Sequence, residues 1–134
     1  MKLRLIDFGG QAPKRAHYND AGLDVYLKKD IVIKPGDSVA IPLGFGVEIP
    51  DGFTGFICPR SSIALEGLSF QLSPIDSGYR GEVHALVQNI SKKTLIFREN
   101  TRIGQLVIVP IILAELKDNL GEERNAGRFG STGR

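Results

Sequence analysis

The sequence has little cysteine, no tryptophan and no long apolar run. Its 134 residues include a single cysteine, Cys58, which excludes an intramolecular disulfide. Two histidines without a cysteine pair make a structural zinc site unexpected. We therefore expect Cys58 to be a small buried hydrophobic residue at the end of a strand.

Charge and hydropathy exclude further classes of protein. The net charge is only +2 and no long basic run occurs, so no nucleic-acid partner is predicted. The longest apolar run, residues 106–114, is too short to span a bilayer and contains Pro110, so no membrane partner is predicted either. Asp7 lies in the N-terminal stretch and argues against a signal peptide. The chain is therefore expected to be cytoplasmic.

What the sequence does contain is apolar residues that recur with a period of two, which predicts strands. The recurring residues include Leu3 and Leu5, Ile31 and Ile33, Val39 and Ile41, Val47 and Ile49, and Val83, Ala85 and Val87. Turn signals lie between them at residues 34–37, 49–52 and 98–100. This spacing predicts an all-β sandwich or barrel. Pro42 and Pro110 are expected at sheet edges or bulges.

Two stretches differ from this pattern. Residues 61–66 favour a short helix, with Ser61 or Ser62 as the expected N-cap and Gly67 as the expected stop. Residues 121–134 hold four glycines and one aromatic residue, Phe129. On composition alone, this segment is expected to be a frayed terminus.

Five short segments rich in polar residues and glycine interrupt the strands. They are Ala-Gly-Leu-Asp at 21–24, Pro-Arg-Ser-Ser at 59–62, Ile-Asp-Ser-Gly-Tyr-Arg-Gly at 75–81, Arg-Ile-Gly-Gln at 102–105 and Arg-Asn-Ala-Gly-Arg-Phe-Gly-Ser-Thr-Gly at 124–133. An aspartate on a hairpin can serve as a general base, and arginine at a helix start can bind an anion. Taken singly, each segment is equally typical of a turn, a helix cap, a strand start or a frayed end.

In this order, and over nearly the whole chain, the five segments resemble the five motifs of the trimeric dUTPase family. The resemblance implies an all-β, distorted jelly-roll subunit of the β-clip type at residues 1–120, with one short helix. It also implies a homotrimer, and a glycine-rich arm at residues 121–134 that closes over a neighbouring subunit's active site. The implied reaction is hydrolysis of dUTP to dUMP and pyrophosphate, which limits uracil incorporation into DNA and supplies dUMP for dTMP synthesis.

The resemblance also implies roles for individual residues. Asp76 would activate a water for attack on the α-phosphorus, and Tyr79 would pack under the deoxyribose. Asp24 would act on Mg²⁺ through water, with the ion lying mainly on the substrate phosphates. The other implied substrate-binding residues are Arg60, Ser61, Ser62, Gln105, Arg124, Phe129, Ser131 and Thr132.

The sequence departs from the family pattern at a few positions. Ser73 and Pro74 replace the usual Gly-Val or Gly-Thr, Asn125 and Arg128 stand where glycine is usual, and Gly104 replaces a common alanine. Pro74 has no backbone N–H to donate to uracil. A pocket closed by shape is expected from residues 68–76.

Two alternatives stay open. A dCTP deaminase-like enzyme would carry an arginine and a catalytic glutamate where this chain has Leu65 and Leu86. A regulatory nucleotide-binding relative would use the same site without chemistry. Retention of Asp76, Arg60, Gln105 and Phe129 argues against lost chemistry, although a fold by itself does not determine function.

Overall fold

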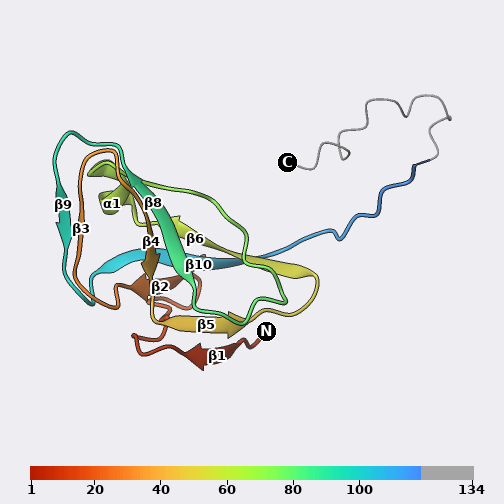
Figure 1. Cartoon of the computed structure of the whole chain (residues 1–134). Helices are drawn as coiled ribbons and strands as arrows, with labels where there is room; N and C mark the ends of the chain where they lie inside the picture. Colours follow the sequence, from red (N-terminus) through yellow and green to blue (C-terminus); the bar gives the residue numbers. More distant parts are fainter. Residues whose placement is uncertain (119–134) are drawn as a thin grey trace.

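The structure, a computed structural model, describes residues 1–118, which are almost entirely β (Figure 1). The strands are β1 (Arg4–Asp7), β2 (Leu23–Tyr26), β3 (Ile31–Ile33), β4 (Ser38–Pro42), β5 (Phe45–Glu48), β6 (Phe53–Pro59), β7 (Leu68–Phe70), β8 (His84–Asn89), β9 (Leu95–Phe97) and β10 (Arg102–Pro110). One short helix, α1 (Ser61–Leu65), lies between β6 and β7. The expectation of an all-β chain with one short helix is confirmed.

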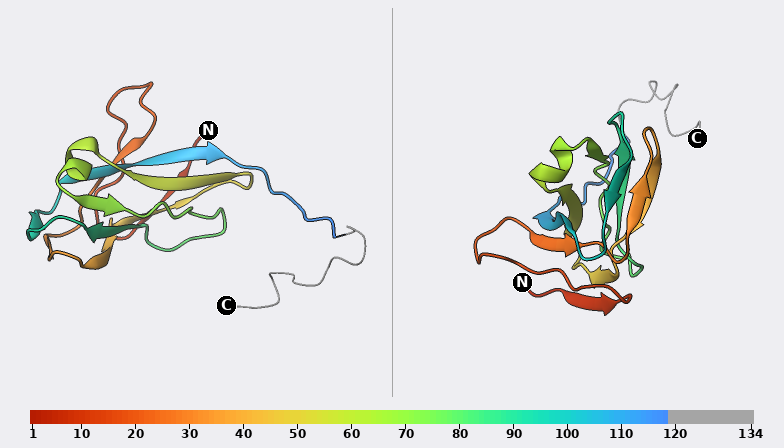
Figure 2. Two further views of the ribbon diagram at one scale, coloured as in Figure 1. Left: turned by 90° about the horizontal axis from the view of Figure 1, so that it is seen from above. Right: turned by 90° about the vertical axis from the view of Figure 1, so that its left-hand side faces the viewer.

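Antiparallel pairing joins strands that are far apart in the sequence. The sheets have the orders β1-β5, β2-β10-β6, β3-β9 and β4-β8-β7. Strand β10 is the longest and lies between β2 and β6. Figure 1 and the left view of Figure 2 place α1 and the β3-β9 ribbon at one end of the body, away from the loop that leads into β8.

The period-two pattern explains most of the core. Burial alternates along β8, where Ala85 and Val87 are buried while His84 and Leu86 are exposed. The pattern misleads in β1, whose Leu5 is 48% exposed. Strand β1 lies at a sheet edge and pairs only with β5, so its apolar face lines a surface groove with Leu3 and Leu23.

The predicted turns and the predicted proline positions are largely observed. The three predicted turns contain left-handed residues, namely Gly36, Gly52 and Asn100 with φ of 84°, 88° and 65°. Pro42 ends β4, which is an edge strand, and Pro110 ends β10 where only β6 is its neighbour. Both prolines therefore sit where a missing N–H removes no ladder bond between two central strands.

The helix prediction needs one correction. Helix α1 ends before Gly67, whose φ of 102° suits glycine, as expected. The N-cap is Arg60 rather than Ser61 or Ser62, and no side chain caps the helix. The two serines already have helical conformation, so they cannot occupy the extended N-cap position.

Within residues 1–118, no helix is long and apolar enough to cross a membrane. Strand β10 ends at Pro110, and residues 111–118 continue without regular structure. Figure 1 shows this segment leaving the body of the protein.

Candidate functional site

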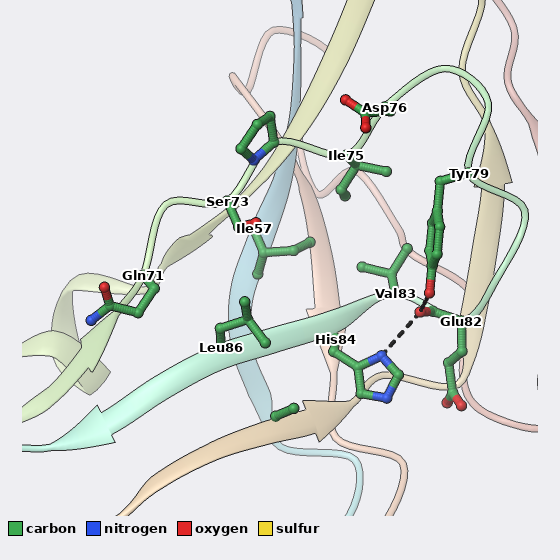
Figure 3. Close-up of a pocket in the computed structure, with 12 residues that line it drawn as sticks. Ile57, Gln71, Ser73, Ile75, Asp76, Tyr79, Glu82, Val83, His84 and Leu86 are labelled. Atoms are coloured by element: carbon green, nitrogen blue, oxygen red, sulfur yellow. Dashed lines mark hydrogen bonds between the residues drawn. The ribbon is translucent and has the colours of Figure 1, made fainter. Parts of the chain in front are cut away.

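A cavity of about 370 Å³ opens between the start of β8, strand β6 and the segment at residues 71–76 (Figure 3). Its apolar walls come from Ala40, Ile57, Pro74, Ile75, Val83 and Leu86. Polar side chains, among them Asp76 and Tyr79, lie at its rim. A mostly apolar hollow with a few placed polar groups is typical of a small-molecule site.

The segment that carries Asp76 is braced on two sides. Ile75 exchanges backbone hydrogen bonds of 2.8 and 3.3 Å with Gly55 of β6. The Ser77 hydroxyl donates to the Asp51 carboxylate at 2.8 Å, which ties the turn to the β5–β6 connection. The exposed Asp76 carboxylate therefore stands at the cavity rim on backbone that both neighbouring residues hold in place.

Tyr79 folds back over the same loop. Its hydroxyl donates to the Glu82 carbonyl at 2.7 Å. A Cβ at Gly81 would lie 2.5 Å from the tyrosine oxygen, so the ring needs a glycine beneath it. The Glu82 carbonyl also lies 3.0 Å from His84 Nδ1. Because a carbonyl only accepts, Nδ1 donates, and one oxygen holds both aromatic side chains at the rim.

A second group of predicted residues lies at the start of β10. Arg102 donates to the Asp24 carboxylate at 3.2 Å. A bulge between Arg102 and Gly104 shifts the register, so that Arg102 faces Tyr26 and Gln105 faces Asp24. Asp24 and Tyr26 share a face of β2, so the bulge puts Arg102 and Gln105 on one face although they are three residues apart.

Two glycines make room for this arrangement. A Cβ at Gly104 would collide with the Cys58 carbonyl oxygen of β6, and a Cβ at Gly22 would lie 2.7 Å from Gln105 Oε1. Glycine at 22 therefore leaves room for the Gln105 side chain, and glycine at 104 lets β10 lie close to the Cys58 backbone of β6.

The Pro-Arg-Ser-Ser segment joins this second group. The Arg60 N–H donates to the Ile103 carbonyl at 3.2 Å, which fixes the start of α1 against β10. Ser61 and Ser62 are exposed in the first turn. We call Asp24, Arg60, Ser61, Ser62 and Gln105 the β10 corner.

The structure thus separates the predicted residues into two places. Ile75, beside Asp76, bridges Gly55 near one end of β6, whereas Arg60 follows the other end. Five residues of extended chain span about 16 Å. Asp76 and Tyr79 line the cavity, and no residue of the β10 corner lines it. The predicted residues Arg124, Phe129, Ser131 and Thr132 lie outside the described residues.

His84 is a cavity residue that the motif reasoning missed. It follows the third motif by three residues and lies on the exposed side of β8. The shared Glu82 carbonyl connects it with Tyr79. Sequence spacing does not predict such a contact, because it depends on how the loop folds back towards the start of β8.

Cys58 is half-buried near the end of β6, opposite Gln105. The predicted strand-end position is confirmed, although burial is less complete than expected. Desolvation raises the pKa of the thiol above its ordinary value. The thiol is therefore neutral near pH 7.

Comparison with known proteins connects this arrangement to one family. The family model described as dUTPase matches residues 9–133. The deoxyuridine 5′-triphosphate nucleotidohydrolase of Clostridium tetani is 36% identical, over 100% of this chain and 97% of that protein.

Solved structures agree in fold. A mutant dUTPase from phage phi11 of S. aureus has a TM-score of 0.84 and 26% identity over 92% of this chain and 99% of its own. Its structure is described as revealing the coordination of a structural Mg(II) ion. A mutant dUTPase of Staphylococcus bacteriophage 80alpha, with dUpNHpp, has a TM-score of 0.83 and 25% identity over 99% of both chains.

The family match covers the β strands from β2 to β10 and all five motif segments, residues 21–133. The expected jelly-roll fold is confirmed by the likeness to the phage enzymes. The match spans far more than half of the chain, and the Clostridium relative covers it completely. The chain belongs to the dUTPase family.

Proposed function

We propose that this protein hydrolyses dUTP to dUMP and pyrophosphate, with Asp76 as the general base for a water that attacks the α-phosphorus. The observation that carries the proposal is the mostly apolar cavity with Asp76 and Tyr79 at its rim, in a chain of the dUTPase family. A carboxylate on braced backbone can hold a water in line and accept its proton.

The cavity suits the nucleoside part of the substrate. Its apolar walls can pack against a flat base, and Tyr79 offers a ring face for the deoxyribose. The hydroxyl of Tyr79 is held on the Glu82 carbonyl, so the ring is fixed before substrate arrives. A ring fixed close under C2′ leaves no room for a 2′-hydroxyl, which supports rejection of UTP.

The β10 corner suits the triphosphate. Arg60, Ser61, Ser62 and Gln105 provide a guanidinium, two hydroxyls and an amide as phosphate ligands. Positioning and charge neutralisation are the main requirements of phosphoryl chemistry. Asp24 pairs with Arg102 at 3.2 Å and holds it on the same face as Gln105.

Mg²⁺ fits these residues as an ion carried by the substrate. Among residues 1–118, no group of three or more acidic, histidine or cysteine side chains could cage a metal. Mg²⁺ keeps much of its water and often binds one carboxylate together with substrate phosphates, so Asp24 would hold it through water. When bound, it supplies charge neutralisation on the triphosphate.

We propose a homotrimer whose sites combine residues of different subunits. Three observations support it: the two groups of site residues lie at opposite ends of β6, residues 111–118 expose Ile112, Leu113 and Leu116, and an apolar groove runs beside β1. Exposed apolar surface of this kind is typical of an interface between chains. A second copy would bring a β10 corner to each cavity.

The arm at residues 121–134, beyond the β body proposed at 1–120, lies outside the described residues. We propose that it closes over a neighbouring subunit's site, with Phe129 over the uracil and Arg124, Ser131 and Thr132 on the outer phosphates. Its glycines and polar residues support this role, since glycine-rich backbone can wrap phosphates. A cytoplasmic location also stays a prediction.

The deaminase alternative finds less support. The position expected to hold its catalytic glutamate is Leu86, an apolar part of the cavity wall. The nearby Glu82 carboxylate accepts from the Gly44 N–H at 2.8 Å and from Lys28 at 3.3 Å. Figure 3 shows it turned away from the cavity. A regulatory relative stays an alternative that only turnover can exclude.

One nucleotide panel tests these proposals together. The purified chain is incubated with dUTP, dCTP, dTTP and UTP, with and without Mg²⁺, and the products are separated. Pyrophosphate and dUMP from dUTP alone support the proposed reaction. Ammonia from dCTP would indicate the deaminase, and dUTP binding without turnover would indicate the regulatory relative.

A further inference from the structure

Glu82 joins the loop that carries Tyr79 to strand β8, and its two polar groups face in different directions. Its carbonyl accepts from the Tyr79 hydroxyl at 2.7 Å and from His84 Nδ1 at 3.0 Å. The next N–H along the chain, that of Val83, donates to the Phe45 carbonyl at 2.8 Å, which fixes the peptide after Glu82. Figure 3 shows the Glu82 carboxylate turned away from the cavity, and hence away from any ligand held there.

The Glu82 carboxylate is held by two donors from other parts of the chain. One of its oxygens, Oε2, accepts from the Gly44 N–H at 2.8 Å and from Lys28 Nζ at 3.3 Å. The glutamate side chain is 18% exposed and the lysine 33%, so salt screens this pair less than a fully exposed one. The contact with Lys28, just after β2, joins residues 54 positions apart.

Gly44 gives this carboxylate a fixed point of attachment. The Gly44 carbonyl accepts from the Phe8 and Gly10 N–H groups at 3.1 and 2.9 Å. The φ of Gly44 is 79°, and a Cβ there would collide with the Gly10 Cα, so the position needs glycine. The carboxylate is therefore bonded to backbone that other residues already hold in place.

The loop just before Val83 has few other connections to the rest of the protein. Among residues 1–118, the N–H groups of residues 80–82 donate to no backbone carbonyl. The Arg80 side chain donates to carbonyls within the same loop and reaches Glu48 outside it at 3.8 Å. The Glu82 carboxylate therefore makes the shortest side-chain contact that ties this part of the loop to the β body.

We propose that Lys28 is a positioning residue for the sugar specificity of the site: its ammonium group holds the Glu82 carboxylate, and thereby the Glu82 carbonyl to which Tyr79 is bonded. This rests on the proposed function, in which the Tyr79 ring leaves no room for a 2′-hydroxyl. A ring whose support can shift would admit UTP more readily. Lys28 does not line the cavity, so it acts through Glu82.

The test measures the preference for dUTP over UTP by competition kinetics. Both nucleotides carry the same base and triphosphate, so their ratio reports the contact with the sugar. Lys28→Met keeps an apolar side chain and removes the charge. Loss of a partly exposed ion pair corresponds to a fall of about two- to fivefold in this preference. The kcat for dUTP stays unchanged, because Asp76 is braced through Ile75 and Ser77 instead.

Two further variants distinguish positioning from a general effect of charge. Lys28→Arg keeps a cation that can reach the Glu82 carboxylate, so it should restore the preference. Lys29→Met removes the same charge from an exposed neighbour and should leave the preference as in the wild type.

A double-mutant cycle shows whether Lys28 acts through Tyr79. Tyr79→Phe removes the hydrogen bond to the Glu82 carbonyl. When Lys28→Met is added to Tyr79→Phe, it should lower the preference less than it does alone, because residues that act through a shared contact are not additive. Effects that simply add would overturn the proposed route from Lys28 to the ring.

The outcomes separate the inference from the proposed function. Wild-type protein that does not cleave dUTP, or that cleaves UTP equally well, contradicts the proposed function and the inference with it. A normal wild-type preference that is unchanged in Lys28→Met overturns the role of Lys28 alone. Equal losses of activity towards dUTP and UTP overturn it too, because they indicate a general structural role. Thermal unfolding of each variant confirms that the fold is intact.

Discussion

The cavity rim and the β10 corner are built in different ways. At the rim, Asp76 and Tyr79 belong to one loop, which is held by the bond from Tyr79 to Glu82 within it and by bonds from Ile75 and Ser77 to Gly55 and Asp51. In the β10 corner, Asp24 and Gln105 are 81 positions apart and strand register brings them face to face. A site on a loop depends on a few individual hydrogen bonds, whereas a site formed by strand register depends on every residue between the two ends of the paired strands.

The largest effect is expected at the rim, from Asp76→Asn. An amide cannot accept the proton of the attacking water, so kcat should fall by about 10²- to 10⁴-fold. The exposed position should leave folding and dUTP binding unchanged. Stopped-flow turnover and calorimetric binding measure the two effects. A near-normal kcat would refute the role of general base.

The second-largest effect is expected from residues 125–134, which belong neither to the cavity rim nor to the β10 corner. Removal of residues 125–134 should lower kcat about a hundredfold, the scale of losing a closing segment that positions the reacting groups. Sedimentation should show an unchanged trimer, because the apolar residues 111–116 remain. Full activity of the truncated protein would contradict closure by the arm.

Gly104→Ala tests whether register builds the β10 corner. The new Cβ would collide with the Cys58 carbonyl oxygen, so β10 must shift. Overpacking of this kind lowers the free energy of unfolding by about 1–3 kcal/mol. Displacement of Gln105 should also raise KM for dUTP. Denaturant unfolding and kinetics measure both, with Gly78→Ala, where a Cβ meets open space, as the matched control. Unchanged stability and KM would show that the β10 corner tolerates a shift of β10 away from β6.

A smaller effect is expected from Tyr79→Phe at the rim. The ring stays, but its hydrogen bond to Glu82 is lost while His84 still donates to the same carbonyl. The half-exposed bond should contribute about a factor of two in preference for dUTP over UTP. Competition kinetics with both nucleotides measure it. A loss of activity similar to that of Asp76→Asn would mean that the hydroxyl takes part in the chemistry.

The smallest effect is a pH dependence of stability at Cys58, which lies beside the β10 corner, opposite Gln105. The raised pKa of Cys58 means that the folded protein holds the thiol proton more tightly than the unfolded chain. This group therefore lowers stability as pH rises from the unfolded thiol pKa through the folded one, and has no effect below. Cys58→Ser should reduce the loss of stability in that alkaline range. Equal loss of stability in the alkaline range for the wild-type protein and Cys58→Ser would contradict a raised pKa of Cys58.

Some features followed from the sequence because they are local. Alternating apolar residues predicted the strands, and Gly67 predicted the end of α1. The order of short motifs predicted Asp76 and Tyr79 together, since only two residues of one loop separate them. The N-cap was misplaced by one or two residues, because the preference for serine at that position says nothing about which residue is already helical.

By itself, the sequence determined the all-β class, the turn positions and the family, because these depend on side-chain pattern over short distances and on motif order. Only the tertiary structure decided which face each predicted residue occupies. The bulge before Gly104 places Arg102 with Gln105, the Glu82 carbonyl joins Tyr79 to His84, and the length of β6 separates the two groups. Such relations depend on register and chain reversal between distant segments, where a shift of one residue turns a side chain to the other face.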